Sequence, residues 1–386
     1  MSEWQKVNLG DCCEITSSKR IFFSEYVESG IPFYRSKEII EKGNGEEISH
    51  PLYISKEKYD EIKGKYGVPQ KGDLLLTAVG SLGIPFVVKD DLPFYFKDGN
   101  LVWLKHFQDI DPIFLYYWIK SENGYNALYN IAIGSAQKAL TIAAIKGYEI
   151  PLPPLQTQHR IATILSRYDS LIENYQKQIK LLEEAAQRLY KEWFIDLRFP
   201  GHENTNIIDG VPEGWTPSQL GQLAEFKRGK TITKKDVIDG DIPVVAGGLE
   251  PAYYCNKSNT AERVITVSGS GANAGFTRMY FEKVWASDCS FVDASTTPFL
   301  HFIYCYLKDN KTTIDNMQKG AAQPHVYAKD INSMELCIPI ESVIKSFERT
   351  ASKYFDTISS LQSQLRLLTE ARDRLLPKLM SGEIEI

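Results

Sequence analysis

The sequence lacks the cysteine pairs and histidine clusters that close disulfides or bind zinc. Its six cysteines include no Cys-x-x-Cys spacing, and no group of histidines lies near them. Secreted disulfide scaffolds and structural zinc sites both depend on such patterns. We therefore expect no metal site and reduced thiols in a cytoplasm at all six positions: Cys12, Cys13, Cys255, Cys289, Cys305 and Cys337.

Long apolar runs are also missing. The longest candidate, Ile113 to Ile119, is far shorter than the roughly 20 residues that a bilayer-spanning helix needs. The N-terminus, Met1 to Trp4, has no basic segment followed by an apolar run, so we expect no signal peptide. These absences predict a soluble cytoplasmic protein that has no membrane partner.

Catalytic motifs are absent as well. The sequence contains neither the Asn/Asp-Pro-Pro-Tyr motif of methyl transfer nor a Walker phosphate loop. The glycine-rich stretch 269–275 has the wrong spacing for a dinucleotide site and favours a loop between strands. The acidic stretch 60–63 and the isolated His159 and His202 favour surface positions over catalytic ones. We expect a non-catalytic binding protein that carries no cofactor of its own.

The overall charge gives no sign of a nucleic-acid partner. The formal net charge is −5, and 386 residues with 43% apolar content favour two or three ordinary globular domains. Local basic clusters do occur, at Lys19-Arg20 and between Lys227 and Lys235. Each cluster fits either a solvated surface or a phosphate contact, and charge alone favours the solvated surface.

The sequence does contain a long heptad pattern, and it contains it twice. From Gln158 to Asp196, apolar residues recur at spacings of four and three, without proline or glycine. The pattern returns 186 positions later, so that Phe347 takes the place of Ile161. An apolar seam is unfavourable in water, so we expect the two helices to pack as an antiparallel coiled coil. The expected seam residues are Ile161, Leu165, Tyr168, Ile172, Tyr175, Ile179, Leu182, Leu189, Phe347, Tyr354, Ile358, Leu361, Leu365, Leu368 and Leu375.

The duplication extends to the segments that precede each helix. Trp4 reappears 211 positions later as Trp215, and Asp98 in an aromatic-rich strand corresponds to Asp288. Just before each helix the offset is again 186, where Gly134, Gln137, Ile145, Glu149 and Pro153 match Gly320, Gln323, Ile331, Glu335 and Pro339. So many agreements in one order indicate an internal duplication of a domain followed by a long helix.

Each globular half is predicted to be a mixed α and β domain, which gives an α+β fold with two pseudo-symmetric domains. Short apolar runs between glycine, proline and aspartate predict strands, as at 73–79 and 264–267, while Pro112 and Pro298 open predicted helices. Thr157 is the predicted N-cap of the first long helix. The predicted borders are 1–153 for the first domain, 154–198 for the first long helix, 199–213 for a linker, 214–340 for the second domain, 341–380 for the second long helix and 381–386 for a tail.

Three stretches resemble one family. The run from Glu149 to Ala162, reading EIPLPPLQTQHRIA, is similar to the specificity subunit of type I restriction-modification systems. So are Leu181-Leu182-Glu183-Glu184 and the terminal run LLPKLMSGEI at 375–384. With the Pro-Glu-Gly-Trp opening at 212–215 and the duplicated plan, the resemblance covers essentially the whole chain.

Two residues depart from that family's pattern. Thr157 stands where the family commonly has an acid, and we interpret this as a change of helix cap. Arg372 lies on the apolar seam where the first helix has Ala186, which indicates a partner contact or a device that fixes the register of the helices.

The resemblance implies a function and a set of partners. In that family each globular half is a target recognition domain that reads one half of a split double-stranded DNA sequence. The paired helices set the spacer and dock two modification subunits, and restriction subunits join the larger complex. S-adenosylmethionine, ATP and Mg are then expected on the partner subunits, and no catalytic centre in this chain.

The candidate DNA-binding residues are polar or basic side chains in glycine-flanked loops, because loops carry recognition and glycine permits close backbone approach. Arginine and lysine suit guanine, and glutamine suits adenine. A solvated loop residue or a structural turn is an equal alternative at every position. The candidates are Lys19, Arg20, Ser81, Gln137 and Lys138 in the first half, and Arg228, Lys230, Ser270, Gln323 and His325 in the second.

Periodicity and duplication also allow a protein of another class. A duplicated scaffold that oligomerises through its coiled coil would show the same heptads and the same internal repeat. The two hypotheses differ in one respect, because a scaffold would retain no specific DNA sequence even with a modification subunit present.

Overall fold

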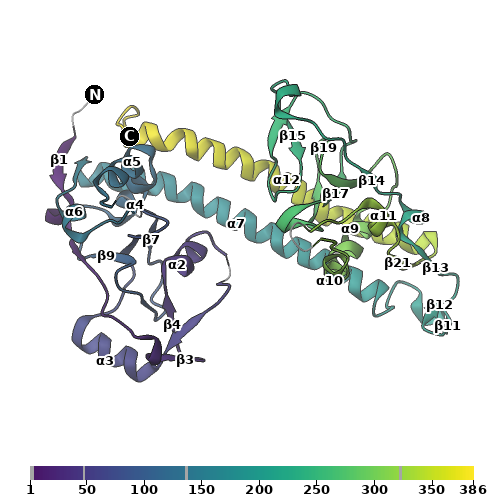
Figure 1. The fold of residues 1–386 in the computed structure, drawn as a ribbon, viewed down its shortest axis with the longest axis horizontal. Helices are drawn as coiled ribbons and strands as arrows, with labels where there is room; N and C mark the ends of the chain where they lie inside the picture. Colours follow the sequence, from purple (N-terminus) through teal and green to yellow (C-terminus); the bar gives the residue numbers. More distant parts are fainter. Residues whose placement is uncertain (1–3, 47, 135–137, 321–323) are drawn as a thin grey trace. The chain divides into compact units, whose positions relative to one another are not determined.

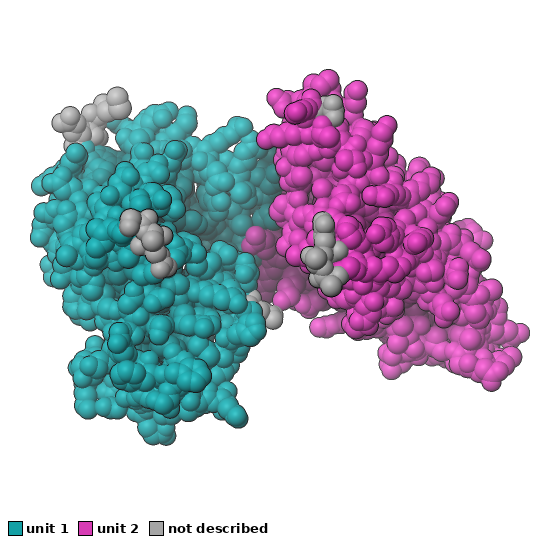
Figure 2. Space-filling model, in the orientation of Figure 1, with its two compact units in different colours: residues 1–174, 365–386 teal, residues 175–364 magenta. Residues whose placement is uncertain are grey.

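The computed structural model describes residues 4–46, 48–134, 138–320 and 324–386. These residues form two compact units, the first made of 1–174 with 365–386 and the second of 175–364 (Figure 2). Each unit contains one globular domain and about half of each of the two long helices. Within the described residues, no helix is long and apolar enough to cross a membrane. The six cysteines all lie in this described part and are free.

The first domain is built around a four-stranded sheet of order β2-β9-β6-β7 and a second of order β3-β5-β4-β8. Its strands are β1 (Gln5–Asn8), β2 (Glu14–Thr16), β3 (Tyr26–Val27), β4 (Ile31–Tyr34), β5 (Leu52–Ile54), β6 (Leu74–Thr77), β7 (Pro85–Val87), β8 (Tyr95–Phe96), β9 (Leu101–Lys105) and β10 (Glu149–Leu152). Its helices are α1 (Leu9–Cys12), the 3-10 turn η1 (Phe23–Glu25), α2 (Ser36–Gly43), α3 (Lys56–Tyr66), α4 (Pro112–Lys120), α5 (Glu122–Ile131) and α6 (Ile142–Lys146).

The second domain repeats this plan. The sheet order β14-β20-β17-β18 matches β2-β9-β6-β7, and the first strand again pairs with the last strand before the long helix. Its strands are β11 (Ile207–Ile208), β12 (Val211–Pro212), β13 (Thr216–Gln219), β14 (Lys227–Arg228), β15 (Ile242–Val245), β16 (Tyr253–Cys255), β17 (Val264–Ser268), β18 (Thr277–Tyr280), β19 (Trp285–Ala286), β20 (Cys289–Asp293) and β21 (Glu335–Ile338). Its helices are η2 (His202–Asn204), α8 (Leu220–Leu223), η3 (Lys234–Asp236), η4 (Gly271–Asn273), α9 (Leu300–Asp309), α10 (Lys311–Asn316) and α11 (Ala328–Asn332).

The central strand β6 shows how the sequence produces these layers. Side chains alternate between the two faces of a strand, and both faces of β6 are covered. Leu74 and Leu76 enter a core with Phe114 of α4 and Leu165 of the first long helix, whereas Leu75 enters a second core. The sequence of β6 is therefore a continuous apolar run rather than an alternation of apolar and polar residues.

The two long helices are α7 (Leu155–Phe194) and α12 (Glu341–Met380). Within each unit they lie side by side and run in opposite directions (Figure 1). In the second unit the Trp193 and Phe347 rings lie 5.9 Å apart, and Glu183 shares a cavity with Gln362. Residue numbers on α12 therefore rise as those on α7 fall, which is the order of an antiparallel pair. This confirms the predicted antiparallel helix pair and the α+β fold.

None of the fifteen predicted seam residues is fully exposed. Six are buried, namely Ile161, Leu165, Ile172, Phe347, Ile358 and Leu361, and the other nine are partly buried, namely Tyr168, Tyr175, Ile179, Leu182, Leu189, Tyr354, Leu365, Leu368 and Leu375.

One local prediction needs correction. Thr157 is not the N-cap of α7, because the helix begins at Leu155 and the Pro154 carbonyl accepts the Thr157 N–H at 2.8 Å. Proline just before a helix suits this position, since the missing N–H has no intrahelical partner. The 199–213 linker also contains structure of its own, the hairpin β11–β12, whose turn places Asp209 and Gly210 at positive φ.

Candidate nucleic-acid interface

In the first domain, three loops leave one end of the β2-β9-β6-β7 sheet. Thr16 at the end of β2 pairs with Trp103, and Thr77 at the end of β6 pairs with Leu101. The segments 17–20, 78–81 and 97–100 therefore meet at this sheet end. They contain the candidates Lys19, Arg20 and Ser81. A fourth loop joins them, because Ala139, next to the candidate Lys138, forms a β-bridge with Val79.

The cations at this sheet end are held by specific contacts. Arg20 pairs with Asp98 at 2.8 Å, with 66% of the Arg20 side chain exposed. The Lys19 N–H donates to the Tyr95 hydroxyl at 2.6 Å, and the Lys19 ammonium lies over the Tyr66 ring. Exposed, charged heads on a fixed backbone suit phosphate or base-edge contacts.

The other two described candidates of the first domain occupy neighbouring loops. The Lys138 ammonium lies 3.6 Å from the centre of the Tyr129 ring, a cation–π geometry. Ser81 is exposed, and its carbonyl accepts a hydrogen bond from the Thr77 hydroxyl, so its backbone is fixed while its own hydroxyl faces solvent.

The equivalent sheet end of the second domain brings three candidates together. Ser270 and His325 form a β-bridge, and the Ser270 hydroxyl donates to the Asp288 carboxylate. Arg228, at the end of β14, lines the same small cavity as Asp288 and His325. This cluster therefore offers hydrogen-bond donors and acceptors to base edges, from a guanidinium, a carboxylate, an imidazole and a hydroxyl.

Lys230 is exposed on the segment that follows β14. Its carbonyl accepts the Trp285 indole N–H at 2.7 Å, which fixes the backbone and leaves the side chain free to reach outward. Gly229 permits this path, because a Cβ there would lie 2.3 Å from the Ser287 carbonyl oxygen.

Two candidates, Gln137 and Gln323, lie outside the described residues. The other eight candidates lie at or beside one of the two matching sheet ends. That they contact bases stays a prediction.

The acidic and aromatic partners of these side chains were not among the residues predicted from the sequence. Asp98 orients Arg20, Asp288 orients Ser270, and the Tyr327 ring stacks on His325 with the ring centres 5.9 Å apart. The matched positions of Asp98 and Asp288 in the duplication were the available signal, since both lie in the short loop that precedes an inner strand of the sheet, β9 or β20.

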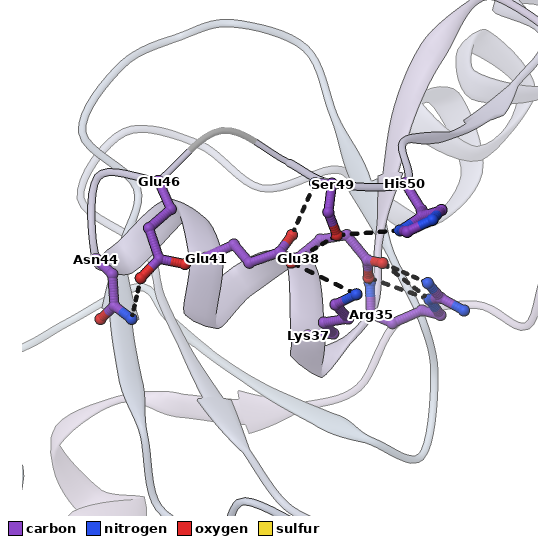
Figure 3. Close-up of polar contacts among 8 residues, drawn as sticks. All are labelled: Arg35, Lys37, Glu38, Glu41, Asn44, Glu46, Ser49 and His50. Carbon is purple, nitrogen blue, oxygen red and sulfur yellow. Dashed lines mark hydrogen bonds and ion pairs between the residues drawn. The ribbon is translucent and has the colours of Figure 1, made fainter. Parts of the chain in front are cut away.

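Two basic residues of the first domain, Arg35 and Lys37, are paired with acids near α2. Around α2, Arg35 forms an ion pair with the buried Glu38, and Lys37 lies 3.6 Å from Glu41 (Figure 3). Glu41 also accepts from the Ser49 hydroxyl at 2.8 Å. Arg35 is held against a buried carboxylate with 40% of its side chain exposed, whereas Arg20 keeps 66% of its side chain exposed beside Asp98, so Arg35 is the less available of the two to phosphate. Within the described side chains, no three His, Cys, Asp or Glu residues come together as metal ligands would.

Comparison with known proteins identifies a family. Residues 1–184 and 212–366 match the family described as the type I restriction modification DNA specificity domain. The type I restriction enzyme MjaIX specificity subunit of Methanocaldococcus jannaschii is 28% identical over 341 residues, which cover 82% of this chain and 78% of that protein. The type I restriction enzyme HindI specificity subunit of Haemophilus influenzae is 22% identical and is matched over 100% of both chains.

A solved structure shows the same fold. The S subunit of the type I restriction-modification system from M. genitalium aligns with a TM-score of 0.65 at 18% sequence identity, and the alignment covers 97% of this chain and 96% of that one. The family match extends over both halves of the duplication and most of both long helices. The chain therefore belongs to the family of type I restriction-modification DNA specificity proteins.

Proposed function

We propose that the chain is the DNA specificity subunit of a type I restriction-modification complex and that each globular domain reads one half of a split DNA target. The observation that carries this proposal is the pair of matching sheet ends. Each presents exposed cations beside hydrogen-bonding side chains, with Arg20 and Lys19 on the first and Arg228 and Lys230 on the second. The two ends differ in side chains, as two readers of different half-sites require.

The two long helices act as the spacer in this proposal. A 40-residue helix is about 60 Å long at about 1.5 Å per residue. Equivalent faces of the DNA major groove recur about every 34–36 Å, so helices of this length can support two separate readers.

The same helices dock the modification subunits. Although their seam residues are buried or partly buried, Leu171 and Leu181 on α7 and Leu367 on α12 remain exposed. Leucines outside the seam offer apolar surface to partner helices. S-adenosylmethionine, ATP and Mg bind the modification and restriction subunits in this proposal, and this chain supplies the sequence preference alone.

The experiment is to co-express the chain with its modification subunit and to map methylated adenines across a genome by single-molecule sequencing. We expect one split motif, methylated on both strands, that is absent when this chain is omitted. A stable complex that leaves the genome without any sequence-selective methylation, although the modification subunit is active with another specificity subunit, would favour the scaffold hypothesis.

A further inference from the structure

Two 3-10 turns occupy the same place in the two domains. The turn η1 at Phe23–Glu25 and the turn η3 at Lys234–Asp236 are 211 positions apart, the offset that also relates Trp4 to Trp215. Each turn follows the basic segment at its sheet end, which contains Lys19 in the first domain. The backbone is therefore repeated, and only the side chains on the turn differ.

In the first domain the turn presents two phenylalanines to solvent. Phe22 is 61% exposed and Phe23 is 86% exposed. Their backbone is fixed, because the Phe22 N–H donates to Glu25 at 2.7 Å and Glu25 in turn pairs with Lys58 at 2.8 Å. Adjacent exposed rings on a fixed turn indicate an interaction surface, since exposed rings add nothing to the stability of the chain on its own.

In the second domain the equivalent turn is basic. Lys234 replaces Phe23, and Lys235 follows it, and both are exposed. They extend the cationic segment that already contains Arg228 and Lys230. A surface of this charge fits a polyanion.

We propose that both turns face the DNA, with Phe23 packing against bases of the first half-site and Lys234 and Lys235 contacting phosphates beside the second. Equivalent turns in a duplicated protein face the same class of ligand, and the basic turn identifies that ligand as a polyanion. DNA offers apolar surface next to its phosphates, namely base faces and thymine methyl groups, which aromatic side chains contact or wedge apart. This inference rests on the proposed function.

The surroundings of the phenylalanines favour DNA over a protein partner. Lys19 and Arg20 lie two to four residues before them and are exposed. Protein–protein interfaces are depleted in lysine, whereas protein–DNA interfaces are strongly positive.

The test uses the complex with the modification subunit and a duplex that contains the mapped target. We expect Phe23→Ala to weaken specific binding about tenfold, as for the loss of one aromatic–base contact, and to leave the salt dependence unchanged. Lys234→Ala with Lys235→Ala should instead weaken binding to specific and random DNA alike, and should reduce the slope of log K against log salt by about 1.8. The fluorescence of 2-aminopurine placed in the first half-site should respond to binding by the wild type and not by Phe23→Ala.

Ile208→Ala is the matched control, because Ile208 is 65% exposed on the β11–β12 hairpin, outside both turns. It should bind as the wild type does. Failure of the wild-type complex to select its target would overturn the proposed function itself. Selective wild-type binding with Phe23→Ala unchanged would overturn only this inference. Loss of the modification subunit from the Phe23→Ala complex on size exclusion would also overturn it, by assigning the turn to a protein interface.

Discussion

The two halves of the helix pair pack through different kinds of contact. In the first unit, Arg372 of α12 pairs with Asp169 of α7 at 2.8 Å, and Asp169 accepts the Tyr117 hydroxyl at 2.7 Å. In the second unit the position equivalent to Asp169 is Phe355, and the position equivalent to Arg372 is Ala186. Both of these residues are buried in an aromatic core.

The difference shows what each half contributes. Large aromatic contacts stabilise the second half, both between the helices, where the Trp193 and Phe347 rings lie 5.9 Å apart, and against α9, where Phe355 stacks on His301 at 4.6 Å. The Asp169–Arg372 pair is satisfied only at one register, because a partly buried charge that loses its partner is unfavourable. Burial and the hydrogen bond to Asp169 also raise the pKa of Tyr117, so its hydroxyl remains a donor. We infer that the first half sets the alignment of the two helices and the second half supplies more of their stability.

Phe355→Ala should have the largest effect on this comparison. Phe355 is 2% exposed and packs on His301 and Tyr304, so its truncation leaves a cavity and should lower the free energy of unfolding by about 3–5 kcal/mol. Urea unfolding followed by tryptophan fluorescence measures this loss. Leu367→Ala, which alters an exposed leucine on the same helix, should change it by less than about 0.5 kcal/mol. Equal losses for the two variants would contradict the assignment of stability to the aromatic half.

Asp169→Ala should have the next largest effect. The Arg372 side chain, which is 22% exposed, then keeps only Asp373 as a partner, and the Tyr117 hydroxyl loses its acceptor. The free energy of unfolding, measured in the same urea experiment, should therefore fall by about 2–3 kcal/mol. The control Glu173→Ala breaks the exposed Lys89–Glu173 pair and should cost less than about 1 kcal/mol.

A double substitution sharpens the same comparison. Asp169→Phe with Arg372→Ala installs in the first half the residues found in the second, and replacing a buried ion pair by apolar residues is often nearly neutral. The double variant should therefore be more stable than Asp169→Ala. If it is less stable, the two halves are not interchangeable in chemistry at this position.

The sequence predicted the helix pair because heptads report which residues face another helix. They did not report the residues that face a globular domain. Tyr190 and Phe194 lie beside the predicted lines and are buried, because their rings pack on Phe302 of α9 at 5.6 and 4.8 Å. Contacts of this kind depend on where α9 docks, and a one-dimensional pattern contains no such information.

The candidate site was predictable only as a set of residue types. Arg228 and His325 are nearly a hundred positions apart in the sequence, and the sheet order β14-β20-β17-β18 brings them to one end. Strand order is set by long-range pairing, such as that of Ser268 with Cys289, and no local spacing encodes it. Equivalence between the two domains was visible in the sequence, and for this reason Asp98 and Asp288 could have been recognised as a pair.

Glu183→Gln should have the smallest effect, and its sign depends on pH. Glu183 of α7 lines a cavity of about 250 Å³ with Arg278 and Lys308. Burial raises the pKa of Glu183 above its ordinary 4.5, although the two cations oppose the shift. The folded state therefore holds this proton to a higher pH than the unfolded chain does, so stability falls as the pH rises between the ordinary and the raised pKa. Below that window the carboxyl is neutral in both states and no penalty remains.

A neutral amide avoids this penalty at every pH. Glu183→Gln should therefore be more stable than the wild type at pH 7, by less than about 1 kcal/mol, and the gain should disappear towards pH 4. Thermal unfolding across this pH range measures the gain, with Glu184→Gln, a neighbouring and more exposed carboxyl, as the control. A gain that persisted at pH 4 would show that the amide acts by packing or hydrogen bonding. A loss at pH 7 would show that attraction to Arg278 and Lys308 outweighs burial, and that the second half of the helix pair, like the first, depends on a charge.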